Sequence, residues 1–117
     1  MKISSRSIED VSTIELIGEV DSVSKRDLEN LLQEFLDTGC HQVVVDLEQV
    51  EFMSSTGMSV FLEYLVKFRD IGGDLRISCV QRDVIRVFRF TKLVEVFKIF
   101  ETTEDAVRSF SPWAITE

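Results

Sequence analysis

Near the start of the chain, hydrophobic and polar residues alternate with the two-residue period of a β-strand. Residues 2–7 and 11–17 are predicted to form two short strands. The polar pair Glu9-Asp10 stands between them and predicts that the strands form a hairpin. Residues 18–21 follow as a predicted turn.

A helical period replaces the strand period after this turn. Leucine and phenylalanine recur three and four positions apart, which predicts an amphipathic helix with one buried face. The residues that set this period are Leu28, Leu31, Leu32, Phe35 and Leu36. Ser22 or Ser24 is predicted to begin the helix, and Gly39 to end it.

Residues 43–47 are apolar on both faces, which is typical of a central strand covered by neighbouring elements. A second helical period comes next and is predicted to end at Gly72-Gly73. It is carried by Met58, Phe61, Leu62, Leu65 and Phe68. Three hydroxyl side chains, Ser54, Ser55 and Thr56, stand at the predicted helix start.

The rest of the chain continues to alternate between the two-residue period of strands and the three- and four-residue period of helices. The pattern predicts strands at 75–80 and 96–100 and helices at 83–91 and 103–109. Such an order favours an α/β fold in which about four α-helices cover a mixed β-sheet of about five strands. A single domain is expected over residues 1–117, with an ordered core at about 2–110 and a tail at 111–117 marked by Pro112, the sole proline.

These helix and strand faces predict which side chains meet in the interior. Seven of them are expected in one core between the helices and the sheet. They are Leu31, Phe35, Val44, Val45, Phe61, Leu62 and Leu65.

The net charge limits the classes of partner that this protein is expected to bind. Thirteen basic against 21 acidic residues give a net charge of −8, which repels nucleic acid and anionic lipid headgroups. An acidic surface suits docking on basic patches of another protein, and it also keeps a small protein soluble. Nothing at the N-terminus resembles a signal peptide, and no apolar run approaches the roughly 18 residues that a membrane span requires. We therefore expect a cytoplasmic protein without membrane insertion.

Few residues offer catalytic or metal chemistry. Cys40 and Cys79 lie far apart without a C-x-x-C pair, so they are predicted to be buried free thiols. The only histidine, His41, is distant in the chain from Ser55, and no Gly-x-Ser-x-Gly elbow surrounds that serine, which disfavours a hydrolase. The carboxylates Asp46, Glu48 and Glu51 are explained as a solvent-exposed group, so no metal site is predicted.

The run of three hydroxyls is the one feature that a simple structural role does not fully explain. One Ser or Thr is enough to cap a helix, and Gly57 allows the first turn to approach the sheet closely. The functional alternative is that one hydroxyl accepts a phosphate, since free N–H groups and the helix dipole stabilise an anion at this end.

Several motifs resemble those of the STAS-domain anti-sigma-factor antagonists. Asp46-Leu47, Phe52-Met53 and Ser55-Thr56-Gly57-Met58 are similar to the family signature that ends the central strand and begins the second helix. Gly18-Glu19-Val20-Asp21 resembles the family's turn before the first helix, and Ile71-Gly72-Gly73-Asp74-Leu75 its helix-to-strand turn. The resemblance covers residues 2–110 and implies the STAS fold.

The resemblance also implies particular site residues. The phosphorylated serine of the family corresponds to Ser55, with Thr56 as the second and Ser54 as the third candidate. Ser54 stands where the family usually has an aspartate, which bears on which hydroxyl is modified. The implied partner-binding residues are Gly18, Glu19, Asp21, Ser54, Ser55, Thr56, Gly57 and Met58.

The mechanism that the resemblance implies is partner switching without catalysis or a cofactor in this chain. The unphosphorylated domain binds an anti-sigma factor that is also a serine kinase of the histidine-kinase-like ATPase fold, and so releases the sigma factor. Phosphorylation ends the binding, and a metal-dependent serine phosphatase resets it. Two alternatives stay open: a structural or docking subunit of a transport or signalling complex, and a small hydrolase that uses Ser55.

Overall fold

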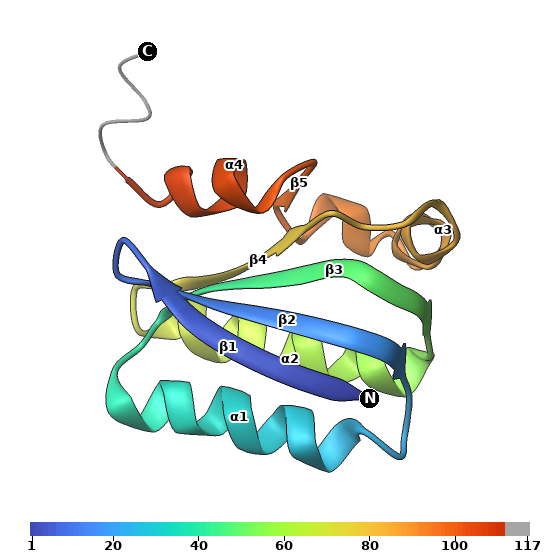
Figure 1. Ribbon diagram of the computed structural model, residues 1–117, viewed down its shortest axis with the longest axis horizontal. Helices are drawn as coiled ribbons and strands as arrows, with labels where there is room; N and C mark the ends of the chain where they lie inside the picture. Colours follow the sequence, from blue (N-terminus) through green and yellow to red (C-terminus); the bar gives the residue numbers. More distant parts are fainter. Residues whose placement is uncertain (112–117) are drawn as a thin grey trace.

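A single five-stranded sheet organises the molecule, whose computed structural model describes residues 1–111 (Figure 1). The predicted tail from Pro112 onward lies outside the described residues. The sheet order is β1-β2-β3-β4-β5. The first pair is antiparallel and the other three are parallel, so the predicted mixed sheet is confirmed. The strands are β1 (Lys2–Ile8), β2 (Val11–Val20), β3 (Gln42–Met53), β4 (Asp74–Ser78) and β5 (Ile99–Phe100).

Four α-helices join or cover these strands, as predicted. They are α1 (Lys25–Thr38), α2 (Ser55–Asp70), α3 (Arg82–Phe90) and α4 (Thr103–Arg108), and a 3-10 helix, η1 (Leu93–Glu95), follows α3. In Figure 1, α1 and α2 lie below the sheet and α4 lies above it. None of the helices within residues 1–111 has the length and apolar character needed to cross a membrane.

The hairpin between β1 and β2 forms where the sequence predicts it. Ile8 pairs with Val11, so the connecting loop is the two-residue segment Glu9-Asp10. Both loop residues have positive φ, 50° and 68°, which is the backbone of the tight turns that match strand twist.

Two strands are longer than the sequence pattern indicates. β2 continues to Val20, so the predicted turn at 18–21 is largely strand, with a register irregularity between Gly18 and Glu19. Gly18 has φ 109°, a conformation that favours glycine, and this explains why the segment resembles a turn. β3 continues from the predicted 43–47 to Met53.

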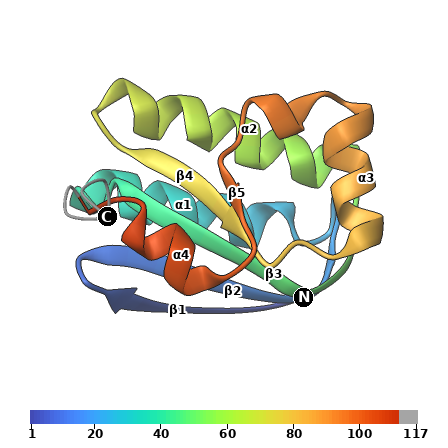
Figure 2. The ribbon, with the colours of Figure 1, turned by 90° about the horizontal axis from the view of Figure 1, so that it is seen from above.

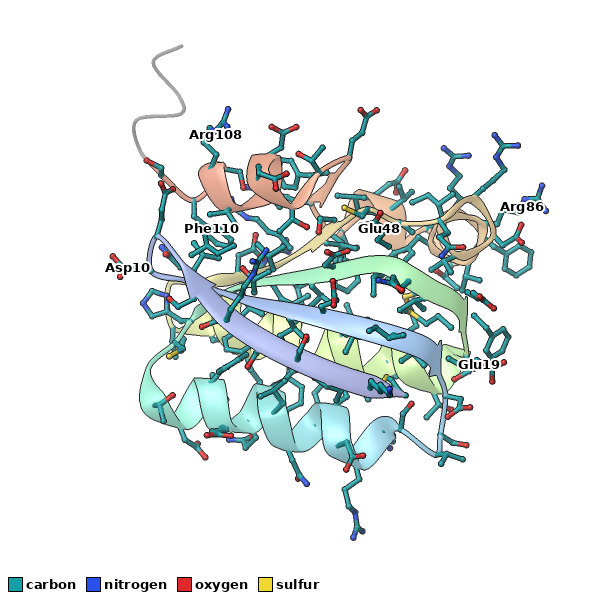
Figure 3. All side chains as sticks on the ribbon, in the orientation of Figure 1. Asp10, Glu19, Glu48, Arg86, Arg108 and Phe110 are labelled. Carbon is teal, nitrogen blue, oxygen red and sulfur yellow. The ribbon has the colours of Figure 1, made fainter. Side chains whose placement is uncertain are left out.

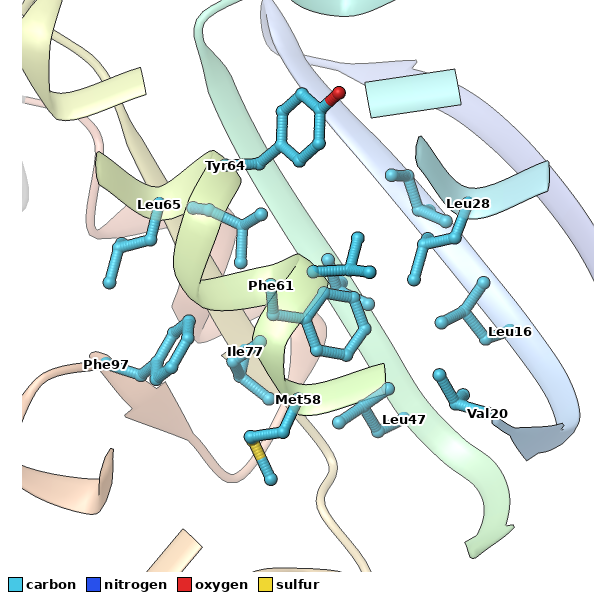
Figure 4. Close-up of a cluster of buried hydrophobic side chains, with 14 of the residues drawn as sticks. Leu16, Val20, Leu28, Leu47, Met58, Phe61, Tyr64, Leu65, Ile77 and Phe97 are labelled. Atoms are coloured by element: carbon cyan, nitrogen blue, oxygen red, sulfur yellow. The ribbon is translucent and has the colours of Figure 1, made fainter. Parts of the chain in front are cut away.

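The main core lies between the sheet and α1 and α2 (Figure 4). Phe61, Leu65 and Val45 are fully buried there, whereas Leu31, Phe35 and Leu62 are half-buried and pack against the same cluster. The prediction was wrong for Val44. Its side chain points to the opposite face of β3 and packs in a smaller cluster with Val11, Ala106 and Val107 under α4.

The predicted strand at 96–100 is the other main correction. Only Ile99–Phe100 forms a strand beside β4. The N–H groups of Val96 and Phe97 both donate to the Leu93 carbonyl, so the turn of η1 continues into the predicted strand and leaves Val94 and Val96 partly exposed. A short edge strand of this kind leaves few backbone groups free for pairing with another chain.

Candidate functional site

The start of α2 is tied to the end of β2. The N–H of Ser54 donates to the carbonyl of Val20 with an N···O distance of 2.8 Å. The Ser54 hydroxyl oxygen accepts a hydrogen bond of 3.1 Å from the N–H of Gly57, so Ser54 is the N-cap of α2. The helix start therefore has a fixed position relative to both parallel strands.

Gly57 is the residue that permits this close approach. A Cβ atom at Gly57 would lie 2.7 Å from Val20 Cγ1 and 2.9 Å from the Val20 carbonyl oxygen. Both distances are shorter than real Cβ contacts, so any larger residue would push α2 away from β2.

Ser55 is the first residue of α2, and its side chain is exposed, as predicted. Within residues 1–111 its hydroxyl has no hydrogen-bond partner. The backbone carbonyl of Ser55 accepts a hydrogen bond of 2.8 Å from the Ser59 hydroxyl, and this bond does not involve the Ser55 side chain. The neighbouring Thr56 is half-buried. Of the three hydroxyls, only the Ser55 hydroxyl is both open and free of a structural role.

Asp21 holds the turn between β2 and α1. Its Oδ1 accepts from the N–H groups of Val23 and Ser24 at 3.0 and 3.2 Å, and its own N–H donates to the Ser24 hydroxyl at 3.0 Å. Of the two predicted helix starters, Ser24 occupies the N-cap position and is buried, whereas Ser22 is exposed. Because these bonds fix the Asp21 carboxylate, a negative charge stands beside the start of α1.

The structure brings the two predicted site segments together. Val20 pairs with Met53 at the carboxyl ends of the parallel strands β2 and β3, so residues 18–21 and 54–58 lie at one end of the sheet. Glu19 projects from this end (Figure 3). Gly57 and Met58 are buried, Met58 with 3% exposure. Both residues support the helix start, and their contact with a partner stays a prediction.

Two exposed apolar side chains at this end were missed by the sequence reasoning. Val23, in the turn before α1, is 88% exposed, and Phe52, the register partner of Glu19, is 50% exposed. Exposed large apolar residues beside a polar site are typical of protein contact surfaces. Strand alternation gave no signal for the exposure of Phe52, because it would place Phe52 on the face of Val50, which is buried.

His41 stands at the opposite end of the sheet from Ser55. The strand that separates them, β3, is 12 residues long. His41 is half-buried, its Nδ1 has no partner among the described residues, and its carbonyl accepts from Asp74 N–H at 3.0 Å. A Cβ at Gly73 would overlap that carbonyl, so this glycine also has a packing role. His41 cannot act as a base for Ser55, which removes the hydrolase built on this pair.

The cysteines differ from their prediction. Cys40 is exposed just after the end of α1, and Cys79 is half-buried after β4. One ligand atom each of Asp46, Glu48 and Cys79 lies within 4.8 Å of the others. The Asp46 carboxylate already accepts the Glu48 N–H at 2.9 Å. Exposed acidic groups often gather without a metal, and we assign no ion to these three residues.

The perturbed pKa values belong to a different part of α2. Burial raises the pKa of Tyr64 above its usual value, and the Tyr64 hydroxyl donates to Gln33 Oε1 of α1 at 3.0 Å. A hydrogen bond to Glu63 raises the pKa of Lys67. The Tyr64–Gln33 bond joins α1 to the middle of α2, the Lys67–Glu63 pair lies within α2, and neither is part of the Ser55 site.

Comparison with known proteins identifies the family. Residues 2–106 match the model of the STAS domain. An anti-sigma-B factor antagonist of Staphylococcus epidermidis is 30% identical over 96 residues, which cover 82% of this chain and 89% of that protein. An anti-sigma factor antagonist from Mycobacterium paratuberculosis has the same fold, with a TM-score of 0.83 and 23% identity over 92% of each chain. The phosphorylated form of the Bacillus cell fate determinant SpoIIAA has a TM-score of 0.75 and 18% identity, over 94% of this chain and 100% of that one. The chain therefore belongs to the STAS domain family.

Proposed function

We propose that this protein is an anti-sigma factor antagonist whose binding state is set by phosphate on Ser55. The proposal rests on the different structural roles of two adjacent serines. Ser54 caps α2, and Ser55 presents an exposed, unbonded hydroxyl on the first turn of the same helix. A protein kinase needs an acceptor of this kind, because it must reach the hydroxyl without unfolding the substrate.

The same geometry ranks the other two hydroxyls. The Ser54 hydroxyl is half-buried and already accepts the Gly57 N–H, so it is less open to a kinase than the Ser55 hydroxyl. Thr56 is half-buried and less accessible. The family resemblance places an aspartate at position 54, and Asp and Ser are both good N-cap residues. The change to Ser54 therefore preserves the cap and leaves Ser55 as the acceptor.

The partner that fits this acceptor is an anti-sigma factor that is also a serine kinase of the histidine-kinase-like ATPase fold. It binds the unphosphorylated protein and so releases its sigma factor. In the transfer step, Ser55 Oγ attacks the γ-phosphorus of ATP held with magnesium by the kinase, the hydroxyl proton passes to a base of the kinase, and ADP leaves. A metal-dependent serine phosphatase in the cytoplasm hydrolyses the phosphoserine. This chain contributes the acceptor and no catalytic group.

The phosphate acts on binding more than on folding. The N–H groups of the first helical turn and the helix dipole favour an anion at Ser55, so the fold accommodates it. SpoIIAA, which shares this fold, has been solved in both unphosphorylated and phosphorylated forms. The docking surface, however, includes Glu19, Asp21 and the apolar Val23 and Phe52. A dianion placed among them weakens the complex about tenfold to a thousandfold through desolvation and like-charge repulsion.

The proposal is tested by incubating the protein with its kinase-type anti-sigma factor and ATP and mapping the phosphate by mass spectrometry. Ser55→Ala is expected to abolish incorporation. Ser59→Ala, which changes another exposed serine of α2, is the matched control and is expected to incorporate phosphate normally. Phosphate on Thr56 would move the switch by one residue. No phosphate on any of the three hydroxyls would favour the structural or docking subunit.

A further inference from the structure

Helix α3 has one buried face and one strongly basic face. Val84 and Phe88 are buried in the main core. On the other side stand Arg82, Arg86 and Arg89, all exposed. Their spacing of four and three residues aligns them along one stripe of the helix. We name these three residues the arginine face.

Most of this charge is not neutralised within the protein. Arg86 has a long contact to Asp83, 3.8 Å between Nη1 and Oδ1, with both side chains largely exposed. Arg82 and Arg89 have no ion pair within residues 1–111. Residues 82–98 carry five basic and two acidic side chains, a local charge of +3, in a chain whose net charge is −8. An exposed pair such as Arg86–Asp83 contributes little to stability, so folding alone does not explain the stripe.

An apolar group stands at the end of the same helix. Phe90 is 92% exposed, and it is followed in the chain by Val94 and Val96, each 37% exposed. Aromatic residues and arginine are the types enriched at the energetic centres of protein interfaces. Nucleic acid and anionic lipid headgroups would be repelled by the rest of the acidic surface.

The arginine face lies at the Ser55 end of the molecule. In both Figure 1 and Figure 2, α3 is beside the end of α2 that follows β3. Val84 and Phe88 of α3 and Met58 of α2 belong to the same main core. The Gln81 amide that precedes α3 donates to the Glu48 carbonyl of β3. A protein that docks over Ser55 is therefore next to α3.

We infer that the arginine face and Phe90 form a second contact surface for the protein that docks at Ser55, and that this partner carries an acidic patch next to an apolar pocket. The inference rests on the proposed function and adds the chemistry of the partner. The arginines steer the encounter, so they act on the association rate and on its salt dependence. Phe90 enters the apolar pocket and acts on the dissociation rate.

The test measures association kinetics with the kinase-type anti-sigma factor at low and physiological salt. The double variant Arg82→Glu/Arg89→Glu is expected to lower the association rate roughly tenfold at low salt, with a smaller loss at physiological salt. The matched control is Arg6→Glu/Arg108→Glu, which makes the same change in net charge at exposed positions on β1 and α4. It is expected to change the rate much less. Phe90→Ala is expected to raise the dissociation rate several-fold.

The outcomes separate this inference from the proposed function. Binding by the wild type that Ser55→Asp weakens, together with equal rates for the two double variants, would overturn the arginine face alone. A wild type that does not bind the anti-sigma factor would overturn the proposed function and the inference with it. Fluorescence anisotropy with a labelled duplex DNA tests whether nucleic acid binds the arginine face instead. If the DNA binds at physiological salt and Arg82→Glu/Arg89→Glu abolishes this binding, the partner of the arginine face would be nucleic acid and not an acidic protein.

Discussion

The N–H of Ser54 donates to the carbonyl of Val20 across a distance of 2.8 Å, at the point where β2 and β3 both end. This bond continues the pairing of the two strands by one residue beyond Met53. It places the start of α2 directly against β2, so the exposed hydroxyl of Ser55 has a defined position at the end of the sheet.

Gly57→Ala is expected to destabilise the protein by about 1–3 kcal/mol, because the added methyl group meets Val20 Cγ1 and the Val20 carbonyl at under 3 Å. The clash opposes the gain of roughly 1 kcal/mol that alanine brings to a helix, and the net change is expected to be destabilising. Urea unfolding of the variant measures it. Ser59→Ala, an exposed site of the same helix, is the control and should change stability by less than about 0.5 kcal/mol. Equal stability of both variants would mean that α2 does not approach β2 as closely as described.

Ser54→Ala is expected to cost about 1 kcal/mol through loss of the cap to Gly57, whereas Ser54→Asp keeps the cap. Unfolding in urea distinguishes the two variants. An alanine variant as stable as the wild type would show that the Ser54 hydroxyl is not the group that caps α2.

Ser55→Asp and Ser55→Ala are expected to melt at similar temperatures but to bind differently. An anion on the first turn of α2 changes stability by only about 0.3–1 kcal/mol. Calorimetry with the kinase-type anti-sigma factor should show tight binding by the alanine variant and a loss by the aspartate variant that reproduces part of the phosphate effect. Equal affinities, with Thr56 variants showing the difference instead, would assign the switch to Thr56.

Phe61→Ala is expected to cost about 3–5 kcal/mol, because this fully buried ring lies between α2 and the sheet (Figure 4). Val66→Ala on the exposed side of the same helix is the control, since Val66 is 52% exposed. A loss below 1 kcal/mol for Phe61→Ala, measured in denaturant melts, would mean that the opposite face of α2 is the buried one.

Tyr64 is the only tyrosine, so its titration can be followed directly by ultraviolet absorbance. Burial raises its pKa, so the midpoint is expected above the usual value of 10.0. The folded state then retains the proton longer than the unfolded state, and this contribution to stability is lost as the pH rises above 10. The Lys67 ammonium lies 4.7 Å from the centre of the ring and lowers the pKa, so Lys67→Gln should raise the midpoint further. A fall of the midpoint in that variant would contradict this account.

The sequence predicts the helices better than the strand lengths, and the reason is local periodicity. α1 and α2 have a continuous three- and four-residue apolar period, so their buried faces and the end of α1 at Gly39 could be found without a structure. The second half of β3 faces solvent with Glu48, Gln49 and Glu51, and its polar composition resembles a loop. Only the pairing with β2 keeps these residues in a strand.

The candidate site could be predicted as a list of residues but not as a surface. The hydroxyl run and its helix start are local features of residues 54–57. The burial of Met58, the exposure of Val23 and the contact of Gly57 with Val20 depend on the register between β2 and β3, which the sequence alone does not determine. The separation of His41 from Ser55 likewise depends on the full length of β3.

Placing the capping oxygen on Ser54 and the open hydroxyl on Ser55 makes two traits of this protein independently variable. Evolution can tune the acceptor, by exchanging serine for threonine or alanine at position 55, without lowering the stability of the helix that presents it. The cap can equally change between serine and aspartate without losing the acceptor. Duplicated copies of such a domain can therefore diverge quickly in how they respond to kinases while they keep the same fold.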